Sequence, residues 1–337
     1  MTSSPTLVYE VPDLKKRYDN WQTLSGNREA AALCWARARW KEVKLLEGLS
    51  LPFLYCTGHP DFKFYDSNGN QATVAGRDVF PMSFLNSVLF LMDSISKQKG
   101  NHIVSQADFL KIVQWVDHVD KSFLKRKVSR ASKDAIYRSE NGRKVLNREF
   151  VSQYARNRWF FLKSEWKLTT EFPIAGLAQM DYDRCCDKQG NVLHGLLQFE
   201  ENFPIIISEP IALETDREKH PKLEYRCWVA GGQLVSASRY LDYDHHTIPP
   251  QIEAFAKQFA DAHRGRLPDY YVVDIGMDMN KGPLVIELNP ISTSGRYIGN
   301  DFGRFLKVLF PKIDDRRLQE VNRTIEEEDK KRLEHLV

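Results

Sequence analysis

The sequence predicts a mixed α/β (α+β) protein in which a helix-rich mixed N-terminal domain precedes a β-rich C-terminal domain with antiparallel hairpins and flanking helices. Two observations support this prediction. Residues 28–47 are almost all helix formers, whereas after Phe150 apolar strand segments recur with glycine-containing turns between them. With 337 residues, the chain is long enough for two domains of about 100–200 residues each.

The composition restricts the class of protein. The formal net charge is only +3, whereas a dedicated nucleic-acid binder is normally more basic. The N-terminus lacks the pattern of a signal peptide, and the longest apolar run, 30–36, is far short of the roughly 20 residues that span a bilayer. The five cysteines form no C-x-x-C pair and favour neither a disulfide framework nor a zinc cluster. We expect a soluble cytoplasmic protein that uses no membrane.

The first half of the chain divides into two parts. Residues 1–120 are predicted to form the helix-rich domain, with helices at 28–47 and 84–95 and no catalytic signature. Residues 121–149 are predicted to be a basic linker, because 121–148 hold ten Lys or Arg and only two acidic residues. Such a run is usually a solvated surface, although a segment that contacts phosphate is the alternative.

The second half is predicted to form one domain over residues 150–312, followed by a charged helical tail at 313–337. The pattern of apolar residues and turns predicts strands, two hairpins and two helices in this domain. The strands are expected at 159–163 and 203–211, the hairpins at 223–240 and 270–289, and the helices at 252–260 and 302–310.

The second hairpin carries two acids. A turn centred on Asn280-Lys281 places Asp274 directly opposite Glu287, with Asn289 on the same face as Glu287. Two facing carboxylates repel one another, and among apolar strands a divalent cation would remove the conflict. Mg²⁺ prefers such oxygen ligands. The alternative is a sheet with one wet face. A register slip of one residue would separate the two acids.

The motif residues resemble a known family. Val272-Val-Asp-Ile-Gly276, followed by Leu284-Val-Ile-Glu-Leu-Asn-Pro290, is similar to the metal-binding strands of the ATP-grasp superfamily. The resemblance covers about residues 150–310 and does not extend to the first 120, which show no clear βαβ unit with a glycine-rich phosphate loop. It implies that ATP and Mg²⁺ (or Mn²⁺) are cofactors, and that Asp274, Glu287 and Asn289 hold the metal.

The resemblance also implies a nucleotide site upstream of the hairpin. Lys163, at the end of an apolar strand, is the best candidate for binding the phosphates, and Lys144 is a weaker one. Glu209 and the backbone of Ile211 are expected to contact adenine. Without the family, Lys163 could equally be a strand-end lysine with its ammonium in water, and Glu209 could end a core strand.

Three arginines are candidates for catalysis. With the first hairpin turning at Gly231-Gly232, Arg239 is expected opposite Glu224, with Arg226 on the same face. These two arginines form either a surface ion-pair cluster or a site for the charge on a phosphoryl or carboxylate group. Arg296, in the polar loop after Asn289, is expected to meet an anion.

The activity implied by the resemblance is ATP-dependent carboxylate–amine ligation, in which an amide or peptide bond forms through an acyl phosphate. The partners would be ATP, a small carboxylate and an amine such as an amino acid or peptide. The alternative is an ATP-binding assembly factor that performs no small-molecule ligation and binds a protein partner through residues 1–120.

Overall fold

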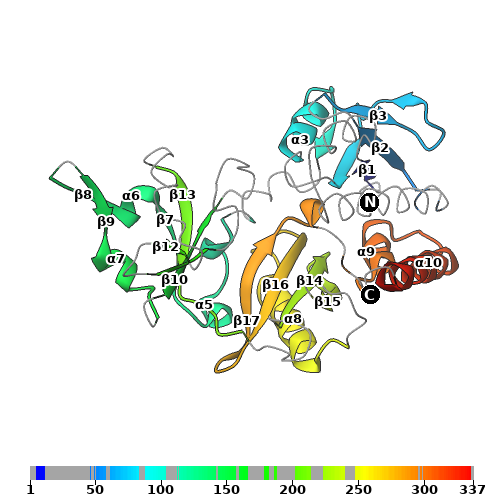
Figure 1. The fold of residues 1–337 in the computed structure, drawn as a ribbon. Helices are drawn as coiled ribbons and strands as arrows, with labels where there is room; N and C mark the ends of the chain where they lie inside the picture. Colours follow the sequence, from blue (N-terminus) through cyan, green and yellow to red (C-terminus); the bar gives the residue numbers. More distant parts are fainter. Residues whose placement is uncertain are drawn as a thin grey trace.

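The computed structural model describes a little over two thirds of the chain, and the description below is confined to these residues. They are 5–11, 46, 49, 51–57, 61–82, 88–103, 112, 114–141, 143–156, 159–165, 178–181, 186–187, 202–213, 223–239, 247–294, 297 and 299–334. Three main sheets follow one another along the chain, and Figure 1 shows the second to one side of the third, with the first above it.

The first sheet is mixed and largely parallel, which corrects the prediction of a helix-rich N-terminal domain. Its order is β4-β3-β2-β1-β5-β6, and β1 pairs in parallel with both β2 and β5. Helix α3 (Val88–Ser96) confirms the predicted helix at 84–95 in part, and the helix predicted at 28–47 lies almost wholly outside the described residues. The strands are β1 (Thr6–Glu10), β2 (Phe53–Thr57), β3 (Lys63–Tyr65), β4 (Gln71–Ala72), β5 (Asp78–Met82) and β6 (His102–Ile103).

The parallel arrangement explains why the sequence hid these strands. All five residues of β1 are buried, so the strand has no polar alternation for a period-two pattern to reveal. Leu7 and Tyr9 on one face join the core shared with the third sheet, and Val8 on the other face joins a separate cluster beneath α3. Short strands buried on both faces resemble any other apolar segment in sequence.

The second sheet is antiparallel, with the order β12-β11-β10-β13-β7. Strand β7 comes from the segment predicted to be a basic linker, and it pairs along its whole length with β13. That segment also forms α5 (Lys121–Leu124), α6 (Lys133–Ile136), the hairpin of β8 (Tyr137–Glu140) with β9 (Arg143–Leu146), and the start of α7 (Arg148–Ser152). It is therefore not simply a solvated connection. The strands of this sheet are β7 (Val128–Ser132), β10 (Trp159–Ser164), β11 (Ala178–Asp181), β12 (Cys186–Asp187) and β13 (Pro204–Ser208).

The third sheet contains both predicted hairpins and has the order β15-β14-β16-β17. The predicted helices are present as α8 (Pro250–Ala262) and α9 (Phe302–Leu309), and the tail forms α10 (Asp315–Glu334). One stripe of α10 is buried in the core, so the tail is not only a surface segment. The strands are β14 (Glu224–Ala230), β15 (Gln233–Arg239), β16 (Tyr270–Asp278) and β17 (Gly282–Asn289).

The two faces of the third sheet have different neighbours, and this difference positions the site. Tyr225 and Val273 belong to the core cluster that includes α8. Trp228 and Val272 belong to the cluster that includes α9, β1 and β5. Since side chains alternate along a strand, Asp274 shares the face of Val272, toward the first sheet. Among the described residues, no helix has both the length and the apolar character needed to cross a bilayer.

Candidate active site

The two acids of the second hairpin lie opposite one another. Asp274 pairs with Glu287 across β16 and β17, as predicted. The Asp274 side chain is 0% exposed and Glu287 is 8% exposed, so both charges are removed from water. The alternative of a wet sheet face is wrong for this pair, and two buried carboxylates in direct opposition require positive charge nearby.

The turn that leads to this pairing differs from the predicted one. The loop has three residues, 279–281, and Asp278 pairs with Gly282, so the strands near the turn are one residue out of the expected register. A β-bulge between Asp274 and Ile275 on β16 restores the expected register, because Ile286 on β17 is left without a partner. The site therefore depends on a bulge that the sequence reading did not include.

Arg126 contacts the bulge and was not a predicted site residue. Its guanidinium donates from one terminal nitrogen to the carbonyl of Val285 and from the other to the carbonyl of Ile286, the latter at 2.9 Å. Burial lowers the pKa of Arg126 to about 10, against the opposite effect of the Glu209, Glu287 and Asp278 charges. The group therefore stays charged at neutral pH.

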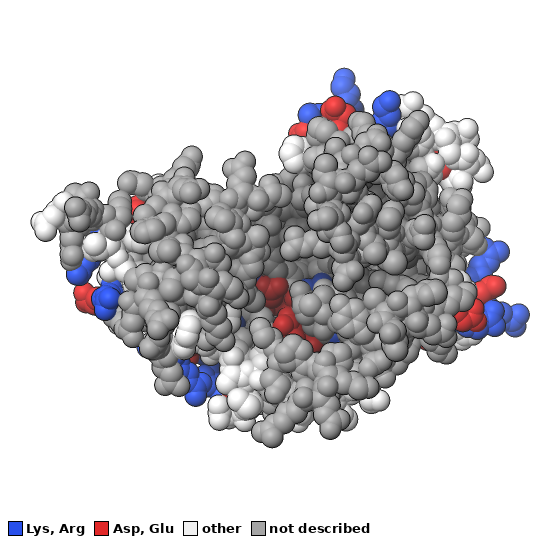
Figure 2. Space-filling view, viewed as in Figure 1, with Lys and Arg blue, Asp and Glu red and all other residues white. Residues whose placement is uncertain are grey.

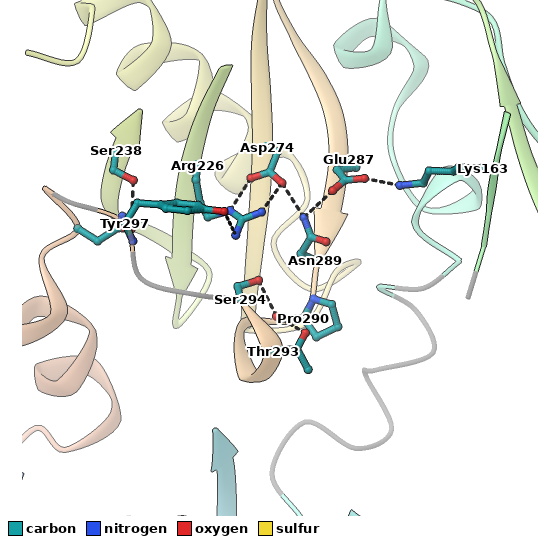
Figure 3. A network of polar contacts seen from close by, with 11 residues as sticks. Lys163, Arg226, Ser238, Asp274, Glu287, Asn289, Pro290, Thr293, Ser294 and Tyr297 are labelled. Atoms are coloured by element: carbon teal, nitrogen blue, oxygen red, sulfur yellow. Dashed lines mark hydrogen bonds and ion pairs between the residues drawn. The ribbon is translucent and has the colours of Figure 1, made fainter. Parts of the chain in front are cut away.

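Two cations balance the two acids. Arg226, on β14, holds Asp274 with a two-pronged contact, Nε to Oδ1 at 2.9 Å and a terminal nitrogen to Oδ2 at 2.8 Å. Lys163, on β10 of the second sheet, forms an ion pair with Glu287 across the junction of the two sheets. The Asn289 amide donates to Asp274 at 2.7 Å and to Glu287 at 3.0 Å (Figure 3).

These residues fit a hard divalent cation. Asp274, Glu287 and Asn289 converge from two adjacent strands and present carboxylate and amide groups, whose oxygens are the ligands that Mg²⁺ takes. In the described part of the chain, no group of three or more His, Cys, Asp or Glu side chains is placed to hold a metal. A site with two carboxylates and one amide leaves coordination positions for water or phosphate oxygens, as is usual for Mg²⁺.

Tyr297 is a further neighbour that the sequence reading missed. Its hydroxyl accepts from Arg226 at 3.2 Å, and the guanidinium lies 4.7 Å from its ring centre. Asn300 fixes the chain here, because its side-chain oxygen accepts from the Tyr297 backbone at 2.9 Å and from Ser238 at 3.1 Å. The buried serine and asparagine thus hold the loop after β17 against β15 (Figure 3).

The other predicted residues are placed differently. Glu209 follows β13, and its carboxylate accepts from the Lys127 backbone at 3.1 Å; Ile211 lies two residues further, in the connection between the sheets. Lys144 pairs through its backbone with Ser139 in the hairpin of β8 and β9, and its side chain is not among those described. The adenine and phosphate roles of these residues stay predictions.

The prediction for Arg239 does not match the register. Tyr225, not Glu224, pairs with Arg239, because a bulge between Trp228 and Val229 shifts the strands after a correctly predicted turn. Ser238 lies opposite Arg226, so strand alternation places Arg239 on the other face from Arg226. Arg296 lies outside the described residues.

The surface over β16 and β17 is hollowed where these charges gather. Figure 2 shows acidic residues together with basic atoms at the centre of this face, in a recess between the parts of the molecule that carry the second and first sheets. The 3-10 helix η3 (Ile291–Thr293), which directly follows the metal-ligand candidates, contacts β5 of the first sheet. All three sheets therefore border the site.

Comparison with known families identifies the class of domain. Residues 179–309 match a family of ATP-grasp domains, the third family of its clade. The match confirms the resemblance to the ATP-grasp superfamily and includes the strands that carry Arg226, Asp274 and Glu287. No significant match is found among curated protein sequences.

Solved structures extend the similarity over the first sheet. D-cycloserine synthetase DcsG is 12% identical with a TM-score of 0.52, covering 94% of this chain and 99% of that chain. The D-alanine-D-alanine ligase from Coxiella burnetii is 11% identical, with a TM-score of 0.48 and coverage of 95% and 98%. A RimK domain ATP-grasp protein from Sphaerobacter thermophilus is 13% identical, with a TM-score of 0.47 and coverage of 90% and 96%. At these identities the DcsG similarity shows the fold alone, and it corrects the view that the resemblance excludes the first 120 residues.

Proposed function

We propose that this protein is an ATP-dependent carboxylate–amine ligase that forms an amide or peptide bond through an acyl phosphate. One observation carries the proposal: Asp274, Glu287 and Asn289 meet in a buried cluster balanced by Lys163 and Arg226. The four charges cancel, and a structural cluster would need nothing more. The ATP-grasp match over residues 179–309 favours the functional interpretation.

Each residue has a distinct role in this proposal. Asp274, Glu287 and Asn289 would hold Mg²⁺ or Mn²⁺, and the bound metal would supply positive charge against the phosphates of ATP. Lys163 lies across the junction from the metal ligands and is placed to contact a phosphate. Arg226 has the planar guanidinium that suits phosphate or carboxylate.

The chemistry needs neutralised charge around the transferring group and no side-chain nucleophile. The carboxylate substrate would attack the γ-phosphate, and the amine would then displace phosphate from the acyl phosphate. We place the acceptor substrate, an amino acid or peptide, between the site and the first sheet, because η3 contacts β5 there. Arg239 and Arg296 are retained as predictions for substrate binding only.

Phosphate release from ATP tests the proposal. The purified protein is incubated with ATP, MgCl₂ and a panel of amino acids and peptides, and we expect release that depends on at least one acid–amine pair. Glu287→Gln should abolish this release, whereas Glu253→Gln, an exposed acid on α8 paired with Lys257 at 2.7 Å, should leave it unchanged.

Nucleotide affinity tests the lysine separately. Lys163→Ala should weaken ATP–Mg²⁺ binding by at least about tenfold, since a hydrogen bond to a charged group contributes roughly 1.5–3 kcal/mol. Lys257→Ala, an exposed lysine, is the matched control. Normal affinity and turnover in Lys163→Ala would remove Lys163 from the site. Tight ATP–Mg²⁺ binding without turnover on any small molecule, together with one co-purifying protein, would instead favour the assembly factor.

A further inference from the structure

The pairing of Asp274 with Glu287 depends on one unpaired residue. Near the turn, Gly276 pairs with Leu284 and Ile275 pairs with Val285. If this register continued, Ile286 would lie opposite Asp274, and Glu287 would turn to the face that packs against α8. The bulge at Ile286 prevents this, so it decides whether the two acids meet.

Arg126 is bonded to the backbone of this bulge. It donates to the carbonyls of Val285 and Ile286, which are consecutive. In a regular strand, successive carbonyls point to opposite sides, so one guanidinium reaches two of them only where the alternation is broken. Strand β17 is the edge of its sheet, so no further strand of that sheet satisfies these oxygens.

The backbone around Arg126 is attached on both sides. The Lys125 ammonium donates to the carbonyl of Lys281 at 2.9 Å, and the Lys281 ammonium donates to the carbonyl of Lys125 at 2.6 Å. The Lys127 backbone exchanges hydrogen bonds with Glu209, at 3.1 Å to the carboxylate and 2.9 Å to the carbonyl of Lys127. Arg126 therefore approaches β17 from a segment fixed to both the hairpin turn and the connection between the sheets.

We propose that Arg126 is a positioning residue for the metal site: its two-pronged grip on Val285 and Ile286 maintains the bulge that brings Glu287 opposite Asp274. The inference rests on the proposed function. Geometry and charge give opposite expectations here. Removing a positive charge near Glu287 would by itself strengthen cation binding, whereas losing the bulge would weaken it. The sign of the effect therefore separates the two explanations.

The metal-dependent gain in nucleotide affinity measures the effect. Calorimetry gives the affinity for the non-hydrolysable analogue AMPPNP with and without MnCl₂, and the ratio is the coupling between metal and nucleotide. The variants are Arg126→Met and Arg126→Lys, with Arg138→Met, an exposed arginine on β8, as the control. A change that only loosened the fold would weaken both affinities and leave their ratio unchanged.

We expect the ratio to fall about tenfold or more in Arg126→Met, because two hydrogen bonds from a charged donor are lost. Arg126→Lys should lose part of the gain, since an ammonium keeps the charge without the planar fork, and Arg138→Met should match the wild type. An unchanged or larger ratio in Arg126→Met, or a full ratio in Arg126→Lys, would overturn the inference alone. A wild-type protein with no gain from Mn²⁺ would overturn the proposed function as well. If Arg126→Met does not fold, Arg126→Lys decides.

Discussion

Replacing Arg226 with methionine should test whether the acids at this site depend on buried positive charge. Asp274 is fully buried and Arg226 is 7% exposed, and the two share a two-pronged contact at 2.9 and 2.8 Å. Arg226→Met keeps most of the length of the side chain and removes its charge. The variant leaves the Asp274 carboxylate opposite Glu287 without the guanidinium that balances it.

The expected loss of stability is large. Removing one partner of a buried ion pair typically costs about 3–5 kcal/mol in the free energy of unfolding, because the other charge stays buried. An exposed pair of similar geometry provides the comparison. Arg264 contacts Asp261 at 2.7 Å, but both side chains are more than half exposed. Breaking that pair with Arg264→Met should cost about 0–1 kcal/mol.

Urea unfolding followed by tryptophan fluorescence is a suitable assay, because Trp228 lies two residues beyond Arg226 on the same strand and is fully buried. The unfolding midpoint should fall clearly for Arg226→Met and little for Arg264→Met. Added MgCl₂ should narrow the gap, since a divalent cation replaces the missing charge. A loss below about 1 kcal/mol, equal to that of the exposed pair, would refute the reasoning that this is a charge-balanced buried cluster.

Two further predictions concern packing and pH. Gly276→Ala should lower the unfolding free energy by about 1–3 kcal/mol through overpacking, because a Cβ there would lie 2.9 Å from Ile286 Cδ1; equal urea midpoints would contradict this. Burial lowers the pKa of His263 below its usual 6.5, and its Nε2 accepts from the Asp120 backbone at 3.0 Å. Stability should therefore be unaffected by this group above pH 6.5 and fall as the pH drops from 6.5 toward the lower folded-state pKa, since only the unfolded chain binds the proton readily there. Urea midpoints across this range should depend less on pH in His263→Gln, whereas the exposed His102→Gln should behave as wild type; a slope unchanged in His263→Gln would count against this account.

The local features of the third sheet could be predicted because their signals are local. Gly231 and Gly232 take positive φ angles of 59° and 68°, which glycine adopts readily, and the hairpin turns there as expected. The apolar stripe at Ile252, Phe255 and Phe259 likewise identified α8, whose buried residues include all three.

The two registers could not be predicted in the same way, because each hairpin contains a bulge. In β14–β15 the turn was right, and the bulge moved Arg239 opposite Tyr225. In β16–β17 the turn was one residue off, and the bulge moved Glu287 back opposite Asp274. The second bulge is bonded to Arg126, about 160 positions away in sequence. No local pattern in the hairpin records such a contact.

The composition of the linker segment misled for a related reason. Its high count of basic residues indicated a solvated surface, yet individual cations in it make specific contacts. Arg130 donates to Glu165 with two of its nitrogens and also pairs with Asp117. Arg126 satisfies carbonyls at the edge of a sheet. A count of charges does not show which of them have buried partners, and those contacts require the tertiary structure.

The contact between Lys163 and Glu287 links the fold to the proposed chemistry. Lys163 belongs to the second sheet and Glu287 to the third, so the ion pair joins two sheets whose junction borders the site. In the proposed function, a divalent cation at Asp274 and Glu287 would supply the charge that Lys163 and Arg226 supply in its absence. Both cations would then be available to phosphate or carboxylate groups. The carboxylates thus keep two mobile cations paired at low dielectric until anionic substrates arrive with the metal, which avoids leaving any of the four charges buried and uncompensated.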